Sequence, residues 1–229
     1  MSRRGLVDEA IQGILDRVVD GGFPAGSALP PEADLAALLE VSRPTMREAV
    51  RSLSDRGVLR VVHGRGTFVA PREEWRDLPT LIGVLARTTP SRDLGLQLIQ
   101  VRRMLEVGAA GLAAENRNDV DLTAMRAVLD GYDEAAARAD VDEVVRLDLA
   151  FHGLVLKASG NPFLAAIMQP LAEALSASRQ TTAAREDVRA RAQEHHRRIL
   201  EAISGGDASA AKDAMRAHMK QTHDDIAAL

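Results

Sequence analysis

Asp148 and His152 lie in the segment RLDLAFHGLVLKASGN, which covers residues 146–161. The apolar residues around them, such as Val144 and Val155, recur at helical spacing, and one helical turn separates the two polar side chains. Both polar side chains therefore lie on the face that the helix turns toward the core. A buried carboxylate beside an imidazole needs a partner, because burial of a charge without one costs free energy. The pair is a candidate for metal ligation.

Two later segments place histidine on an apolar face in the same way. His196 and His218 each fit the helical stripe of apolar residues in their own segment. His195 neighbours His196 and lies only about 100° away around a helix, so periodicity alone barely separates these two. His223 falls off its stripe and is expected to be exposed.

Three neutral imidazoles and one carboxylate are suitable ligands for zinc, nickel or manganese. The alternative is that each is an ordinary core histidine bonded to a backbone carbonyl, which is the commoner role of a single buried histidine. Four polar groups that point toward one interior favour the metal. We therefore predict a divalent metal ion, with zinc as the first choice, on Asp148, His152, His196 and His218.

Arg102 is a further polar residue on an apolar helical face, flanked by Leu98, Leu105 and Ala109. A guanidinium in this position can clamp the carboxylate of a small effector whose other oxygens coordinate the metal. The alternative is that Arg102 reaches the surface or pairs with a nearby acid such as Glu106. The sequence leaves both interpretations open. Effector binding would give Arg102 a role in function, whereas the alternative is a purely structural contact.

The composition describes the protein that must position these groups. The chain has 229 residues, of which 46% are hydrophobic and only 3% aromatic, which favours packed helices over sheets. It contains no cysteine, which excludes disulfides, thiolate metal ligands and a cysteine nucleophile. No apolar run reaches the roughly 18–20 residues of a membrane span, and the start of the chain lacks the apolar core of a signal peptide. We therefore expect a cytoplasmic protein that makes no membrane contact.

Secondary-structure signals divide the chain into two domains and a linker. Residues 1–71 contain three helical segments and two β-rich runs around a glycine turn, which is the pattern of a winged helix-turn-helix. Residues 72–79 are polar and irregular and are expected to be the linker. Seven helical segments follow from residue 77 onward, which predicts an all-α antiparallel bundle of six or seven helices over residues 80–229. The predicted fold class is mainly α.

The segment SRPTMREAVRSL has the chemistry of a DNA-reading helix. Arg43, Arg47 and Arg51 recur every four residues on the face opposite the apolar stripe. Arginine matches both guanine edges and phosphates, although an exposed charged face is the plain alternative. The net charge of −4 is unevenly distributed, since residues 43–65 hold six arginines and two acids. This local excess of positive charge favours double-stranded DNA as the partner.

The predicted hairpin that follows this helix adds a small basic tip. Its residues are His63, Gly64, Arg65 and Gly66. The two glycines allow the backbone to approach a phosphate or a minor groove closely. A glycine-arginine-glycine turn is a weak signal alone, but its place directly after a DNA-reading helix indicates a wing that contacts DNA.

The stretch LPPEADLAALLEVSRPTMREAVRSLSDRGVLRVVHGRGTFV resembles the DNA-binding domain of the GntR family of bacterial transcription regulators. It contains that family's leucine-proline-x-glutamate, valine-serine-arginine and arginine-glutamate-alanine motifs, and the glycine-x-glycine-threonine-phenylalanine-valine wing. The family often has an arginine that contacts the DNA backbone where this chain has Ala33. The resemblance implies that the DNA contacts are made by Arg43, Thr45, Arg47, Arg51, Gly64, Arg65 and Gly66.

The remainder of the chain resembles the ligand-sensing domain of the FadR subfamily of GntR regulators, known as the FCD domain. The matching pieces are VRRMLEVGAAGLAAE, DLAFHGLVLKASGNP, EHHRRILEAI and AMRAHM. The family pattern of histidine-arginine-x-isoleucine-leucine selects His196 over His195. The resemblance implies a metal on one aspartate and three histidines, and an arginine equivalent to Arg102 that binds small carboxylates such as sugar acids or hydroxy acids.

These features together predict a dimeric, metal-containing transcription regulator, expected to be a repressor. Two winged domains would bind the halves of an inverted-repeat operator, and a carboxylate effector would change the affinity for DNA. The alternatives are a metal-dependent enzyme that acts on a small carboxylate and a DNA-binding regulator whose metal is purely structural. An acyl-CoA sensor is disfavoured, since that type does not need the histidines.

Overall fold

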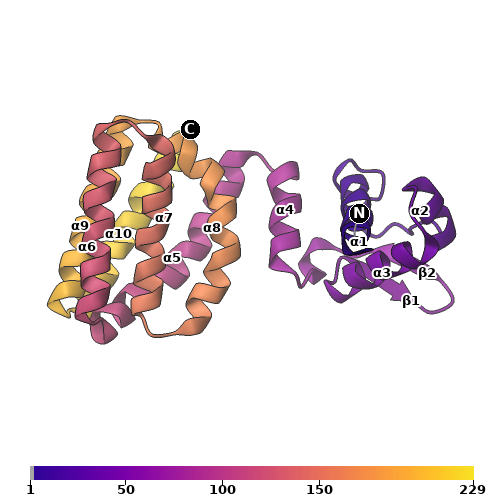
Figure 1. The fold of residues 1–229 in the computed structure, drawn as a ribbon, viewed down its shortest axis with the longest axis horizontal. Helices are drawn as coiled ribbons and strands as arrows, with labels where there is room; N and C mark the ends of the chain where they lie inside the picture. The colour runs from indigo at the N-terminus through magenta and orange to yellow at the C-terminus, as the bar shows by residue number, and fades with distance from the viewer. Residues whose placement is uncertain (1–2) are drawn as a thin grey trace. The chain divides into compact units, whose positions relative to one another are not determined.

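The computed structural model describes the backbone of residues 3–229 and the side chains of residues 5–172, 174 and 179–229. The chain forms two compact units, which divide after Thr88. Each unit has its own hydrophobic core. The mainly helical fold class and the winged helix-turn-helix predicted from the sequence are confirmed (Figure 1).

The first unit begins with α1 (Arg3–Val19), followed by α2 (Glu32–Leu38) and α3 (Arg43–Asp55). The Ser42 side chain caps α3, since its hydroxyl accepts from the backbone N–H of Thr45 at 3.2 Å. The face of α3 predicted to be apolar is buried, and Met46 and Leu53 are fully enclosed against α1 and α2. The opposite face of α3 stays open, which leaves its polar residues in contact with solvent.

The wing is an antiparallel hairpin of β1 (Leu59–Val62) and β2 (Gly66–Val69). Leu59 pairs with Val69 at its base and Val62 pairs with Gly66 next to the turn. Gly64 and Gly66 have φ of +72° and +109°, which side chains other than glycine rarely adopt. The two glycines therefore shape the tip of the wing.

A short 3₁₀ turn η1 (Arg72–Glu74) and helix α4 (Leu78–Thr88) complete the first unit. Trp75 is buried and its indole N–H donates to the carbonyl of Ala70 at 3.1 Å. Val84 of α4 belongs to the core of this unit, and Arg87 contacts Asp16 of α1 at 2.6 Å. The sequence placed this helical segment with the bundle, whereas its apolar face packs in the N-terminal unit.

The second unit is an all-α bundle of six helices. They are α5 (Ser91–Asn116), α6 (Asp119–Ala137), α7 (Val141–Ala158), α8 (Pro162–Ala183), α9 (Glu186–Gly205) and α10 (Ala208–Ala227). α6 and α7 pack side by side, as do α5 and α10 (Figure 1). Phe151, Ile199 and Met215 are fully enclosed between α5, α6, α7, α9 and α10.

Side-chain caps define the ends of these helices. Asn118 and Asp121 form a capping box at the start of α6, and Asp140 and Asp207 cap α7 and α10. Asn161 accepts from the backbone N–H of Phe163 at 3.1 Å, as expected for the helix-start signal in the sequence. These caps set the residue at which each helix begins. The face on which each polar residue lies then follows from helical spacing.

Candidate metal centre and DNA interface

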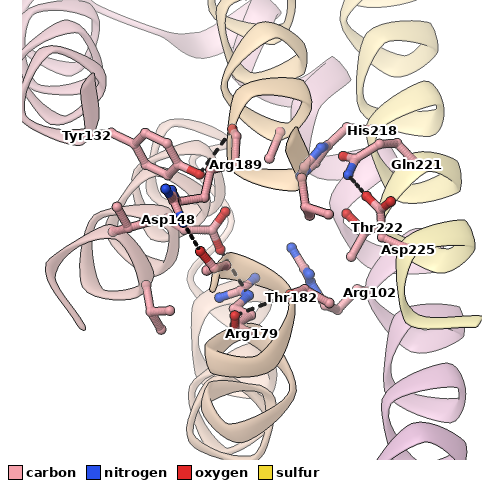
Figure 2. A pocket seen from close by; sticks show the side chains of 15 residues that line it. Arg102, Tyr132, Asp148, Arg179, Thr182, Arg189, His218, Gln221, Thr222 and Asp225 are labelled. Carbon is pink, nitrogen blue, oxygen red and sulfur yellow. Dashed lines mark hydrogen bonds and ion pairs between the residues drawn. The ribbon is translucent and has the colours of Figure 1, made fainter. Parts of the chain in front are cut away.

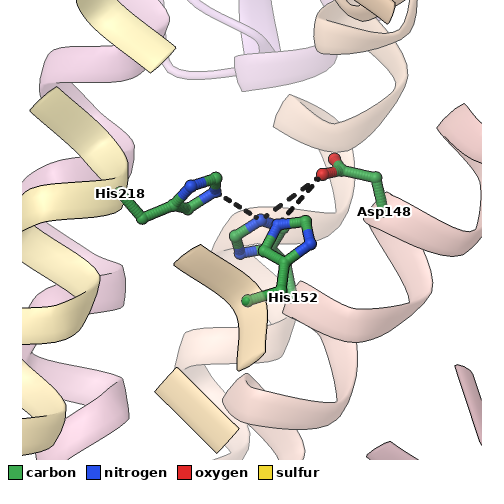
Figure 3. A group of neighbouring side chains, drawn as sticks. Asp148, His152 and His218 are labelled. Atoms are coloured by element: carbon green, nitrogen blue, oxygen red, sulfur yellow. Dashed lines mark hydrogen bonds and ion pairs between the residues drawn. The ribbon is translucent and has the colours of Figure 1, made fainter. Parts of the chain in front are cut away.

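Four ligand-bearing side chains meet inside the bundle, as the sequence predicts. Asp148 and His152 come from α7, His196 from α9 and His218 from α10, and one ligand atom of each lies within 4.8 Å of all the others. The three histidines are at most 4% exposed. Figure 3 shows Asp148, His152 and His218 turned toward one another between the helices. The histidines of three separate helices thus share one interior position.

Short contacts connect Asp148, His152, His196 and His218, the four candidate ligands that together are called the metal cluster. The Nε2 atoms of His152 and His218 lie 3.2 Å apart, and Nε2 of His196 lies 3.3 Å from Oδ1 of Asp148. Burial lowers the pKa of His152 to about 4 and that of His218 well below its ordinary value. Imidazoles with such pKa values are neutral at pH 7, so their nitrogen lone pairs are free to bind a cation.

The donor set fits a divalent metal ion. Nδ1 of His196 and Nδ1 of His218 are buried and have no hydrogen-bond partner among the described residues, while Nε2 of His196 faces Asp148. Burial acts to raise the pKa of Asp148, but the guanidinium of Arg179 and the cluster histidines hold it well below its usual range. A carboxylate beside three imidazoles is a ligand set that zinc accepts.

Glu106 of α5 supports this cluster from outside. Its Oε2 lies 2.5 Å from Nδ1 of His152, and both side chains are buried. A carboxylate at this distance favours the tautomer that carries the proton on Nδ1 and leaves Nε2 free to bind a metal. The sequence named Glu106 only as an alternative partner of Arg102, and its contact with His152 depends on packing between α5 and α7.

Arg102 pairs with Glu106, which is one of the alternatives that the sequence left open, and it also lines a cavity. It is 1% exposed, and its Nε donates to Oε1 of Glu106 at 2.6 Å. It also lines the cavity beside the metal cluster, into which its guanidinium points (Figure 2). Arg102 therefore does not reach the surface, and its pairing with Glu106 holds the guanidinium at the cavity wall.

Arg179 of α8 is a cavity residue that the sequence analysis missed. Its Nε contacts Oδ2 of Asp148 at 2.9 Å, and its Nη1 is buried with no hydrogen-bond partner among the described residues. Burial, with the nearby charge of Arg102, lowers the pKa of Arg179 to about 10, so it stays charged at pH 7. Its position eight residues after the buried Leu171 places it on the inward stripe of α8, and this spacing could have identified it.

The cavity has a free volume of about 50 Å³ and is bounded by α5 to α10. Asp148 and His218 bring the metal cluster to its wall, and Gln221, Thr222 and Tyr132 add polar groups (Figure 2). The remaining wall includes valine and alanine side chains. A cavity that combines an apolar wall with convergent polar and charged groups is typical of a small-molecule site.

The other histidines lie outside the cluster. His195 is partly buried next to His196 but is not among the four grouped residues, and His223 is exposed. His63 lies at the exposed tip of the wing.

The predicted DNA-contacting residues lie mostly on the open face of the first unit. Arg43, Arg47 and Arg51 of α3 are exposed, and Nε of Arg47 lies 3.2 Å from Oε2 of Glu32. Thr45 differs from them, because it is only 7% exposed and its hydroxyl shares a 2.7 Å hydrogen bond with that of Ser42. In the structure Thr45 therefore helps to form the first turn of α3.

The wing tip is exposed as a whole, over residues His63, Gly64, Arg65 and Gly66. The guanidinium of Arg65 lies 5.9 Å from the ring centre of Phe68. This position is within range of a cation–π contact, which supports the arginine without neutralising it.

Among the described residues, no helix is long and apolar enough to cross a membrane.

Two family models match the chain. Residues 6–69 match the model described as bacterial regulatory proteins of the gntR family, and residues 97–221 match the FCD domain. The HTH-type transcriptional regulator LutR of Bacillus subtilis is 29% identical, over 90% of this chain and 94% of that protein. The galactonate operon transcriptional repressor of Escherichia coli is 30% identical, over 86% of each chain. A putative L-lactate dehydrogenase operon regulatory protein of Escherichia coli is 29% identical, over 96% of this chain and 86% of that protein.

Solved structures show the same architecture. A GntR protein of Streptococcus agalactiae is 27% identical, with a TM-score of 0.56, over 95% of this chain and 99% of the other. The Escherichia coli protein McbR/YncC, 19% identical, matches the fold with a TM-score of 0.56 over 100% of this chain and 98% of the other. The relatives named here are regulators of transcription rather than enzymes.

Proposed function

The chain belongs to the GntR family of bacterial regulatory proteins and carries an FCD domain, so it is a DNA-binding regulator of transcription; from this membership we propose a dimeric, metal-dependent repressor that responds to a small carboxylate. The observation that supports this proposal best is the shared wall of one cavity. The metal cluster and the guanidinium of Arg102 border the same small space. A metal ion and an arginine are the two groups in proteins that bind carboxylate oxygens most effectively.

The first unit is the DNA-binding part of this proposal. Exposed arginines on α3 would contact base edges and phosphates, and the wing would contact the adjacent backbone. Since a two-fold dimer requires a two-fold site, the operator is expected to be a short inverted repeat. Dimer formation is assigned to the second unit.

The metal cluster would hold a divalent ion, with zinc as the first choice and nickel or manganese as alternatives. When bound, the ion supplies a Lewis-acidic point that attracts carboxylate and hydroxyl oxygens. Glu106 fixes the orientation of His152, and Arg102 offers donors to the same ligand. The names of two of the relatives refer to lactate and galactonate, which are both hydroxy acids.

Effector binding changes DNA affinity only if the effector binds one state of the dimer more tightly than the other. In a repressor of this type, the effector-bound state is the one with low affinity for the operator. The response thus requires that the bundle adopt two arrangements with different cavities.

A thermal-shift screen of the metal-loaded protein against sugar acids, hydroxy acids and dicarboxylates tests the proposal. A ligand at a hundredfold excess over its dissociation constant adds about 2.7 kcal/mol to the free energy of unfolding. We expect at least one carboxylate to raise the melting temperature, and the shift to disappear in Arg102→Ala. If no carboxylate shifts the melting temperature while metal is present, the metal is structural and the sensing proposal is wrong.

A further inference from the structure

The cavity holds more buried positive charge than the described side chains around it neutralise. Arg102, Arg179 and Arg189 line it and are each at most 8% exposed. Glu106 pairs with Arg102, and Asp148 pairs with Arg179. Arg189 donates instead to the backbone carbonyls of residues 183 and 184, at the end of α8. Since a divalent ion on the metal cluster adds two further positive charges, the occupied cavity needs an anionic ligand.

Arg179 has donor capacity left after its ion pair. Its Nε serves Asp148, whereas its buried Nη1 has no hydrogen-bond partner among the residues that the structure describes. Figure 2 shows the guanidiniums of Arg179 and Arg102 as separate groups at one end of the cavity, contributed by α8 and α5. A buried N–H without an acceptor is costly, so a ligand oxygen at this position would be strongly favoured.

Gln221 of α10 supplies an acceptor on the same cavity. Its Nε2 donates to Oδ2 of Asp225, while its Oε1 is buried and has no partner in the described part of the chain. Asp225 is itself neutralised by Arg191 at 2.7 Å, so it does not offset the charge of the cavity arginines. A free carbonyl oxygen suits a ligand hydroxyl, which can donate to it.

We propose that the effector is a small hydroxy dicarboxylate: one carboxylate binds at the metal cluster with Arg102, and the second binds Arg179. This inference rests on the proposed function, since it names the class of ligand for the same site. Arg179 then acts as the specificity residue that separates dicarboxylates from the monocarboxylate hydroxy acids. Two carboxylates also match the two charges that a divalent ion brings to the cavity.

Calorimetric titration of the full, zinc-loaded chain with three probes tests this assignment. Lactate, malate and 3-phosphoglycerate all carry a 2-hydroxycarboxylate, and they differ in having a methyl, a carboxylate or a phosphate at the other end. We expect malate to bind at least about tenfold more tightly than lactate, the factor that corresponds to about 1.4 kcal/mol. We expect Arg179→Gln to lower the malate-to-lactate affinity ratio toward 1, with both affinities measured at equal zinc occupancy, because Arg179 also contacts the zinc ligand Asp148.

Arg185→Gln is the matched control, because Arg185 is exposed and pairs with Asp187 outside the cavity. It should retain the preference of the wild type. If Arg179→Gln fails to fold or loses zinc, the ratio is measured in Arg179→Lys, which retains the charge but has fewer donors. A fall in the malate-to-lactate affinity ratio at equal zinc occupancy then supports the proposal, and an unchanged ratio overturns it.

The remaining outcomes distinguish failure of the dicarboxylate assignment from failure of the proposed carboxylate sensor. Equal affinities for lactate and malate in the wild type overturn the dicarboxylate assignment and leave the proposed carboxylate sensor intact. Tighter binding of 3-phosphoglycerate than of malate assigns Arg179 to a phosphate and overturns the second carboxylate. Absence of binding by every carboxylate, with zinc present, overturns both the proposed function and this inference.

Discussion

Glu106 connects the arginine at the cavity wall to a histidine of the metal cluster. It accepts from Nε of Arg102 at 2.6 Å and lies 2.5 Å from Nδ1 of His152. Burial acts to raise the pKa of Glu106, but the charge of Arg102 and the hydrogen bond with His152 lower it far below its ordinary value. A carboxylate that contacts both groups couples the position of Arg102 to that of His152, so the proposed effector contact and the proposed metal ligation would be linked at Glu106.

Glu106→Gln is therefore expected to weaken zinc binding without removing a ligand. The neutral amide no longer favours the proton on Nδ1 of His152, and loss of such supporting partners typically costs about 10- to 100-fold in metal affinity. Competition titration of zinc against a chromogenic chelator measures the effect. Glu115→Gln is the control, because Glu115 lies exposed on the same helix. Unchanged zinc affinity in Glu106→Gln would show that packing alone orients His152.

At the scale of the helices, periodicity located the faces that carry the metal cluster, and the family pattern was needed to choose His196 over His195. The buried stripes of α7, α9 and α10 placed Asp148, His152, His196 and His218 inward, and the structure brings their ligand atoms together. Periodicity assigns a residue to a face but does not say which unit that face packs against. The apolar face of α4 was therefore assigned to the bundle, although it completes the core of the first unit.

The sequence could not predict the contacts between helices that complete the site. Arg179 lies on the inward stripe of α8, yet its role depends on reaching Asp148 of α7. The contact between Glu106 and His152 likewise joins two helices that are far apart in the sequence. Thr45 was assigned to DNA through the family resemblance; its hydroxyl contacts that of Ser42 in the structure, and its contact with DNA stays a prediction.

A glycine at the end of α3 allows a prediction about the element that positions the wing. Gly57 has φ of +77°, and a Cβ there would lie 2.6 Å from the carbonyl oxygen of Glu74. Gly64, at the wing tip, has a similar φ of +72° but no atom within 4 Å of its Cβ position. Gly64→Ala should therefore cost only the left-handed backbone, about 1 to 2 kcal/mol, and Gly57→Ala should cost more.

Urea unfolding of the full chain measures this difference. Trp75 is the only tryptophan in the sequence and is buried in the first unit, so its fluorescence reports on that unit. The midpoint of the Trp75 transition should fall further for Gly57→Ala than for Gly64→Ala. Equal midpoints would show that the segment at Glu74 moves aside without cost.

At the scale of the whole molecule, the arginines expected to contact DNA and the residues of the metal cluster lie in different units. The exposed arginines of α3 belong to the first unit, and the metal cluster belongs to the second. Net charge follows this division, since residues 1–72 hold ten arginines and nine acids within a chain whose net charge is −4. A cation-rich DNA face on an otherwise acidic chain favours binding through that face alone.

This separation predicts opposite effects of two single substitutions. Arg47→Ala removes an exposed guanidinium of α3 and should weaken DNA binding while zinc content and carboxylate binding stay as in the wild type. If Arg47 contacts a phosphate, the slope of log affinity against log salt should fall by about 1. His196→Ala removes a buried cluster residue and should abolish the carboxylate response while metal-independent DNA binding persists.

Both variants are compared by fluorescence anisotropy on a duplex selected in vitro with the full chain, and by calorimetry with the effector class found in the screen. Glu48→Gln, an exposed change on the same helix as Arg47, controls for general effects on α3. If either single change removed both activities in a folded protein, DNA binding and effector sensing would share one site. Opposite losses instead show that the two sites are separable, as expected because no residue of the metal cluster belongs to the unit that carries the exposed arginines of α3.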